Sequence, residues 1–139
     1  MVDESHRDRR RYQRLERRDE IQVKEYTYPE RGGYGPARIL DISGGGLQIE
    51  TRRHFPAGAQ LKIEMNFVGW QRYTPGFLKY FGEAARRPLV VLAEVVRCSS
   101  VVPGRKYEVA VTFSGIDENH RRALVKFVRE QITQRTDQP

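Results

Sequence analysis

The sequence has few of the residues that build disulfide frameworks and metal centres, and it lacks a long apolar run. One cysteine, Cys98, occurs in 139 residues, which excludes an intramolecular disulfide and any multi-cysteine metal site. There is no apolar run of about 18 residues, the length of a transmembrane helix, and no apolar stretch of a signal peptide follows the charged N-terminus. We therefore expect one cytoplasmic domain without membrane insertion, in which Cys98 is a small buried apolar residue.

Acidic side chains are outnumbered by basic ones, and the imbalance is largest at the N-terminus. Lys and Arg total 25 against 18 Asp and Glu, a net charge of +7. Residues 1–18 hold four acids, no lysine and seven arginines, namely Arg7, Arg9, Arg10, Arg11, Arg14, Arg17 and Arg18. Because so few apolar residues accompany them, residues 1–19 are predicted to be a flexible arm. The excess positive charge predicts an anionic partner.

From Glu20 onward, short alternating apolar runs separated by turn residues predict antiparallel β-structure. Strands are expected from Ile21 and over residues 37–42, 46–51, 60–67, 89–98 and 107–113, with turns at 31–36, 55–58 and 103–104. After Gly115 the apolar spacing becomes helical, and Asp117 is expected to cap a helix that ends near Thr133. The predicted fold is mainly β: a six-stranded antiparallel barrel with a C-terminal helix over one open end, spanning residues 20–133. Residues 134–139 are expected to be a tail.

Residues 69–88 interrupt this pattern with a cluster of aromatic side chains. Trp70, Tyr73, Phe77, Tyr80 and Phe81 crowd into a segment that is long for a loop between strands. The helical spacing of its second half predicts a short helix. We expect the aromatic rings to fill the mouth of the barrel; the alternative is a contact surface for a partner protein.

A glycine-rich turn follows the second predicted strand. Asp41 and Ser43 precede Gly44-Gly45-Gly46, where successive backbone N–H groups are able to form a concave anion site. The two acceptor oxygens of Asp41 suit the N1 and N2 donors of guanine. The alternative is a hairpin turn in which Asp41 and Ser43 bond their own backbone.

The chemistry of arginine narrows the class of anion. A guanidinium binds phosphate through two hydrogen bonds, matches the O6/N7 edge of guanine and stacks on purines, whereas lysine supplies only a point charge. An arm with seven arginines and no lysine therefore favours a nucleotide over a general negative surface. A solvated arm that only increases solubility is the alternative.

Together, the arm and the turn resemble the PilZ domain family. Arg10 and Arg14 fit its RxxxR motif, and Asp41, Ser43 and Gly46 fit its [D/N]xSxxG motif, in the same order along the chain. Residues 95–97, the strand at 109–113 and the closing helix are also similar to the family, so the resemblance covers nearly the whole chain. The aromatic segment 69–88 departs from the usual family pattern.

The resemblance implies a bacterial receptor for the second messenger cyclic di-GMP, with no other cofactor and no metal. The implied ligand-binding residues are Arg9, Arg10, Arg14, Asp41, Ser43, Gly45, Gly46 and Arg97. In the family the residue before RxxxR influences ligand stoichiometry, and Arg9 at that position favours a stacked pair of ligands. The arm is expected to close over the ligand and to signal to an effector protein that the sequence does not identify.

Three other functions compete with this hypothesis. An enzyme is disfavoured because His6, His54 and His120 lack metal-ligand spacing and no nucleotide-hydrolase or nucleophile motif occurs. Non-specific nucleic-acid binding would use the basic arm but would not need Asp41 and Ser43. A PilZ fold without ligand, acting as a protein adaptor, would not need either motif.

Overall fold

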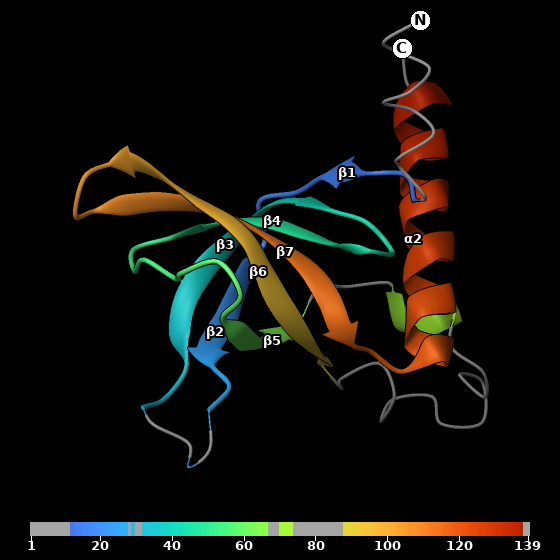
Figure 1. The fold of residues 1–139 in the computed structure, drawn as a ribbon. Coiled ribbons are helices and arrows are strands. Elements are labelled where there is room, and N and C mark those ends of the chain that lie inside the picture. The colour runs from blue at the N-terminus through green and yellow to red at the C-terminus, as the bar shows by residue number, and fades with distance from the viewer. Residues whose placement is uncertain (1–11, 28, 30–31, 67–69, 74–87, 138–139) are drawn as a thin grey trace, which may run out of the picture.

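The computed structural model describes residues 12–27, 29, 32–66, 70–73 and 88–137. The elements in these ranges are β1 (Leu15–Glu16), β2 (Glu20–Glu25), β3 (Gly35–Ile42), β4 (Gly46–Thr51), β5 (Gln60–Met65), the 3-10 helix η1 (Trp70–Tyr73), β6 (Leu89–Val102), β7 (Lys106–Gly115) and α2 (Glu118–Asp137) (Figure 1). None of the described helices is long and apolar enough to cross a membrane.

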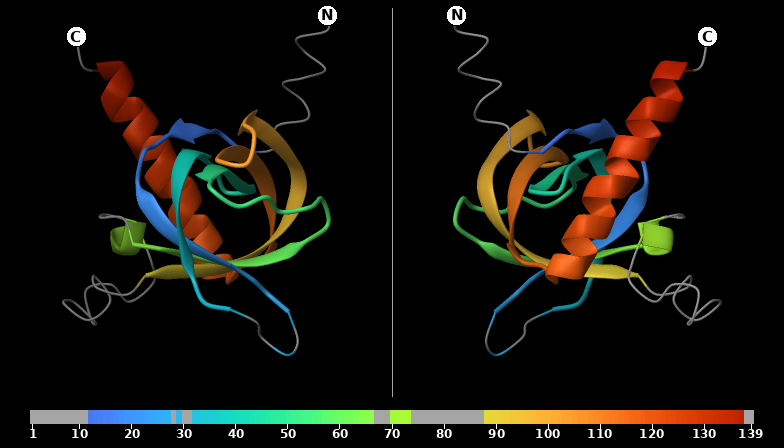
Figure 2. Two further views of the ribbon diagram at one scale, coloured as in Figure 1. Left: turned by 90° about the vertical axis from the view of Figure 1, so that its left-hand side faces the viewer. Right: turned by 90° about the vertical axis from the view of Figure 1, so that its right-hand side faces the viewer.

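Strands β2 to β7 form a closed antiparallel barrel, which confirms the predicted architecture. The strand order is β1-β3-β2-β5-β6-β7-β4, and an additional pairing between β3 and β4 closes the ring. Helix α2 crosses one open end of this ring (Figure 2). Strand β1 pairs with β3 beside β2 and lies at the same end of the barrel.

Alternating side chains fill the interior. Leu61, Ile63 and Met65 on β5 are fully buried, because every second residue of a strand faces the same side. Leu124 and Phe127 of α2 join the same core. Burial of one such side chain contributes roughly 1.5–3 kcal/mol, so the helix is an integral part of the barrel rather than an appendage.

The described residues include 12–19, the last part of the segment that the sequence assigns to the arm. Leu15 is 2% exposed, and it pairs with Ile42 of β3. The backbone N–H of Arg17 donates to the carbonyl of Leu40 over 3.1 Å, and the Arg17 guanidinium contacts Asp19 at 2.6 Å. Residues 12–19 therefore lie against the barrel, because the one apolar side chain that they bury anchors them there.

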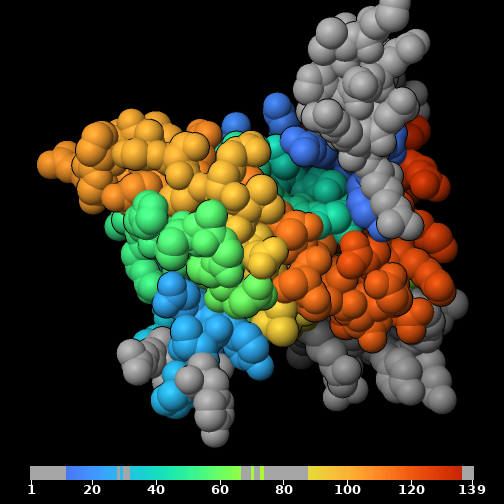
Figure 3. All heavy atoms as spheres, in the orientation of Figure 1, coloured from blue at the N-terminus to red at the C-terminus, as the bar shows by residue number. Residues whose placement is uncertain are grey.

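The last two strands and the helix are longer than the predicted ranges. Strands β6 and β7 pair as far as Val102 and Lys106, and Gly104, with φ of 74°, makes the turn between them. Their tip projects from the body of the molecule (Figure 3). Helix α2 continues to Asp137, where Arg135 in the last turn complements the helix dipole. Residues 134–137 are therefore helical rather than part of a tail.

The aromatic segment is described only in part. Trp70 is 2% exposed and meets His120 of α2 edge-to-face, with ring centroids 5.2 Å apart. It therefore packs beside the closing helix, a partner that the sequence analysis did not foresee. Residues 74–87, including the predicted short helix at Phe77 and Phe81, lie outside the described residues. Cys98, predicted to be buried, is only half-buried.

Candidate functional site: a pocket at the β3–β4 turn

A pocket of about 370 Å³ lies where residues 12–19, below called the N-terminal segment, meet β3, β4, β6 and β7. Its lining residues are Tyr12, Arg14, Asp41, Ser43, Gly45, Gly46, Leu47, Gln48, Val96, Arg97, Ala110, Val111 and Thr112. The volume falls in the range of small-molecule sites, roughly 300–1,000 Å³. In Figure 3 the atoms of β4 form the floor of a recess between β6 and the N-terminal segment.

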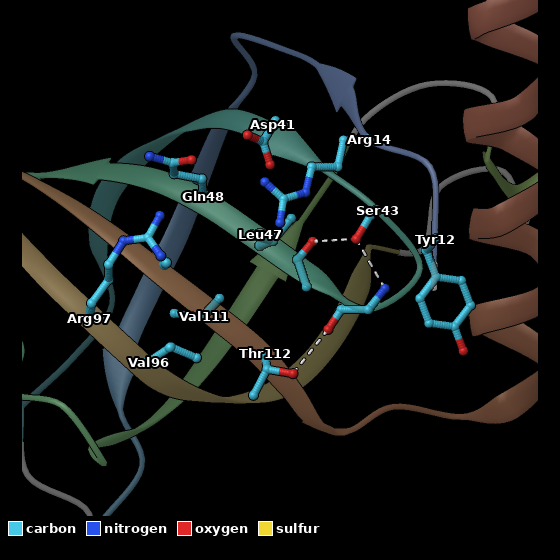
Figure 4. Close-up of a pocket in the computed structure, with 13 residues that line it drawn as sticks. Tyr12, Arg14, Asp41, Ser43, Leu47, Gln48, Val96, Arg97, Val111 and Thr112 are labelled. Atoms are coloured by element: carbon cyan, nitrogen blue, oxygen red, sulfur yellow. Dashed lines mark hydrogen bonds between the residues drawn. The ribbon is translucent and has the colours of Figure 1, made fainter. Parts of the chain in front are cut away.

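The structure brings together most of the residues that the sequence predicts. Arg14, Asp41, Ser43, Gly45, Gly46 and Arg97 all line this one pocket. Figure 4 shows the guanidinium groups of Arg14 and Arg97 pointing into the same hollow from opposite sides. Arg9 and Arg10 lie outside the described residues, so their placement stays a prediction.

A β-bulge turns Asp41 into the pocket. Ala37 and Ile39 face the core, and strict alternation would place Asp41 there too. In the ladder with β4 the register shifts between Ile39 and Asp41, so Leu40 is an extra residue. The shift directs Ile42 into the core, where it is 1% exposed, and Asp41 outward.

A second bulge does the same for Arg97. In the ladder between β6 and β7 the register shifts between Val95 and Arg97, which leaves Val96 as the extra residue. Val95 is buried, Cys98 packs against the core, and Arg97 is exposed and lines the pocket. Two bulges on separate strands thus aim a carboxylate and a guanidinium at one pocket.

Hydrogen bonds within the glycine turn favour its interpretation as a hairpin. The N–H of Ser43 donates to the carbonyl of Gly46 over 3.0 Å, and the N–H of Gly45 donates to Ser43 Oγ over 3.1 Å. Ser43 Oγ in turn donates to the Gly46 carbonyl over 3.4 Å. The N–H groups of Ser43 and Gly45 are thus used inside the turn, and the pocket also contains the guanidinium groups of Arg14 and Arg97. The alternative hairpin turn, with Ser43 bonding its own backbone, describes the structure.

The glycines of the turn serve close packing rather than unusual backbone angles. Among the described residues, positive φ occurs at Gly32, Gly58 and Gly104, and not at the three consecutive glycines. A Cβ on Gly46 would overlap the carbonyl oxygen of Val111 in β7. A Cβ on Gly45 would lie 3.0 Å from the ring of Tyr12. Glycine is therefore required by contact with β7 and with the N-terminal segment.

Sequence reasoning missed seven pocket residues: Tyr12, Leu47, Gln48, Val96, Ala110, Val111 and Thr112. Gln48 lies between the buried Leu47 and Ile49, so its outward direction follows from strand alternation, a signal available in the sequence. Thr112 pairs with Gly46 and donates from Oγ1 to the Gly45 carbonyl over 3.3 Å. That contact depends on strand pairing, which no local pattern indicates.

The candidate chemistry of the site is recognition of an anion with a hydrogen-bonding edge. Two guanidinium groups supply fork-shaped donors for phosphate, and the Asp41 carboxylate supplies acceptors. The described residues contain no group of three or more His, Cys, Asp and Glu side chains arranged to hold a metal ion.

Comparison with known families identifies the fold. The sequence profile of the PilZ domain family matches residues 8–130. The chain belongs to the PilZ domain family. This match includes both motifs, the barrel and most of α2. No curated protein matches the chain in sequence.

Several solved structures share this fold at low sequence identity. Bacillus subtilis Inhibitor of motility (MotI/DgrA) has a TM-score of 0.65 and 19% identity, over 91% of this chain and 52% of that one. The K. pneumonia MrkH–c-di-GMP complex has a TM-score of 0.63 and 14% identity, over 91% and 54%. The PilZ domain of YcgR from Escherichia coli with c-di-GMP has a TM-score of 0.58 and 15% identity, over 94% and 99%. The chain thus spans about half the length of the first two proteins and nearly all of the third.

Proposed function

We propose that this PilZ domain binds cyclic di-GMP in the pocket at the β3–β4 turn. The observation that carries the proposal is the convergence of Arg14 and Asp41, from two separate motifs, on one pocket of suitable volume. The MrkH and YcgR structures with the same fold are described with c-di-GMP. The role is that of a receptor and not of an enzyme.

Each side chain has a distinct part in the proposed complex. Arg14 and Arg97 bind phosphate or stack on guanine, and Asp41 accepts hydrogen bonds from the guanine N1 and N2 groups. Ser43 holds the β3–β4 turn, which follows directly after Asp41, in place through its hydrogen bonds to Gly45 and Gly46. The glycines allow the base to approach the backbone.

The arm completes the site in this proposal. Arg9 and Arg10 contact the ligand, and Arg9 favours a stacked pair, so two ligands bind to each chain. Closure of the arm changes the surface that an effector protein contacts. Ordering the arm costs conformational entropy, which lowers the affinity below that of a preformed site.

Calorimetric titration with cyclic di-GMP tests the proposal. Arg14→Ala and Asp41→Ala are each expected to weaken binding about ten- to hundredfold, because a hydrogen bond to a charged group contributes about 1.5–3 kcal/mol. Arg105→Ala in the β6–β7 turn and Glu130→Ala on α2, both exposed and outside the pocket, are the charge-matched controls and should bind as the wild type does.

Two results would contradict the proposal in different ways. No heat with wild-type protein at high micromolar ligand would exclude a receptor and favour an adaptor without ligand. Equal binding of a polynucleotide, combined with an Asp41→Ala variant of unchanged affinity, would instead indicate a non-specific nucleic-acid-binding protein. One ligand per chain would exclude the stacked pair assigned to Arg9.

A further inference from the structure

One residue of helix α2 reaches the ligand motif directly. Arg121 Nη1 donates to the carbonyl of Gly44 over 2.8 Å, which joins the first turns of the helix to the β3–β4 turn. Its Nε contacts Glu118 one turn earlier at 3.3 Å. The Arg121 side chain is 21% exposed, so a large part of this charged group is removed from water. Hydrogen bonds to charged groups are the stronger ones in proteins.

The same guanidinium also lies over the N-terminal segment. The Arg121 Cζ atom is 5.9 Å from the centre of the Tyr12 ring, within reach of a cation–π interaction. Tyr12 stands inside the RxxxR motif, two residues before Arg14. Figure 4 shows its ring between the turn and the helix.

Close packing makes this junction sensitive to small changes. A Cβ on Gly44 would lie 2.5 Å from Val125 Cγ2 and 2.9 Å from Tyr12 Cδ1. The helix, the turn and the tyrosine ring therefore meet around one glycine. A displacement of any of the three disturbs the other two.

We propose that Arg121 is a positioning residue of the ligand site. From helix α2 it holds the Gly44 turn and Tyr12, and through them it sets the placement of Asp41 and Arg14 in the pocket. This inference rests on the proposed binding of cyclic di-GMP. By reciprocity, a ligand that fixes the turn and the N-terminal segment also strengthens the docking of α2.

Four variants distinguish a positioning role of Arg121 from a role in the stability of the fold alone. Arg121→Met removes the donors and the charge at similar length, whereas Arg121→Lys keeps the charge. Arg122→Met is the matched control, because Arg122 is exposed on the same helix. Gly44→Ala disturbs the junction while leaving Arg121 intact. For each variant, the dissociation constant for cyclic di-GMP, the urea midpoint of the ligand-free protein and the rate of tryptic cleavage after Arg14 are measured.

We expect the variants that alter the junction to bind cyclic di-GMP more weakly. Arg121→Met and Gly44→Ala should each weaken binding roughly tenfold or more, with Arg121→Lys in between and Arg122→Met within about twofold of wild type. Cleavage after Arg14 should be faster in Arg121→Met than in Arg122→Met, even without ligand. A purely structural role would lower the urea midpoint but leave the affinity of the folded protein unchanged.

The inference fails separately from the proposed function. If folded Arg121→Met and Gly44→Ala bind like wild type, Arg121 does not position the site, although the receptor function stands. If wild-type protein does not bind cyclic di-GMP, the receptor function is wrong. Faster cleavage of the Arg121→Met variant would still support the contact between Arg121 and the N-terminal segment. If the Arg121→Met variant does not fold, the same measurements on Gly44→Ala and Arg121→Lys test whether Arg121 positions the ligand site.

Discussion

At the scale of single residues, Gly46 shows how the binding motif also belongs to the barrel. It pairs with Thr112 of β7, and a side chain at this position would overlap the Val111 carbonyl. The requirement for glycine is therefore a packing requirement between two backbones, at a residue that also lines the pocket. A backbone, unlike a flexible side chain, cannot move aside cheaply.

Gly46→Ala is expected to destabilise the protein by about 1–3 kcal/mol, as overpacked sites do. The cause is the forced separation of β4 from β7, and urea unfolding followed by circular dichroism measures it. Gly33→Ala is the control: Gly33 is exposed and a Cβ there would meet no atom within 4 Å. It should change the stability by less than about 0.5 kcal/mol. Equal stability of the two variants would contradict the packing argument.

Residue types and spacing predicted part of the pocket but not its full lining. Asp41 and Arg14 are recognisable because the motifs that contain them have fixed spacing. Tyr12 is not, because its role depends on the approach of α2. The sequence left an anion site and a hairpin open at the turn, because the internal bonds of Ser43 are not visible in it.

At the scale of elements, the helix start follows from one side chain. Asp117 Oδ1 accepts the backbone N–H of Asn119 over 2.8 Å and that of His120 over 3.2 Å, the arrangement of an N-cap. This confirms the cap predicted from the sequence. The cap fixes where α2 begins, and so where Arg121 stands relative to the turn.

Asp117→Ala should lower the free energy of unfolding by about 1 kcal/mol, since two N–H groups lose their acceptor. Asp117→Asn, which keeps an acceptor oxygen, should differ from wild type by only a few tenths. Thermal or urea unfolding of the three proteins gives both values. Equal losses in the two variants would mean that the charge of Asp117, and not its capping bonds, stabilises the helix.

The bounds of some strands were predicted, those of β6 and β7 were placed too short, and the bulges were not predicted. Strand β4 matches the prediction at both ends because glycine and polar residues flank a clear apolar alternation. The bulges at Leu40 and Val96 shift the alternation by one residue. The three-residue spacing of the apolar residues Ile39 and Ile42 breaks the alternation of a strand and indicates a bulge in the sequence. Only the pairing with the neighbouring strand shows which residue is the extra one.

At the scale of the whole molecule, the barrel and its helix form one core. Leu15 from the N-terminal segment, the barrel strands and Phe127 from α2 all belong to the same buried cluster. Chain segments that are distant in sequence thus support the pocket together. Composition could not predict this, because the described part of this segment, residues 12–19, contributes one fully buried side chain among its charges.

Trp70 offers a test of this single core, since it is the one tryptophan and is 2% exposed beside α2. Its fluorescence should be shielded from iodide in the folded protein. In urea, its emission and the far-UV circular dichroism should change in coincident transitions, as expected for a small cooperative domain. Separate transitions would show that α2 and η1 unfold independently of the barrel.

The central claim is that cyclic di-GMP binds at the β3–β4 turn, and amide NMR of the 16.2 kDa protein tests it most directly. On titration, the resonances of Ser43, Gly45, Gly46, Gln48 and Thr112 should shift together. Those of Arg52 and Lys106, at the opposite end of the strands β4 and β7, should stay in place. An unchanged spectrum, or shifts centred on Arg52 and Lys106, would contradict the account.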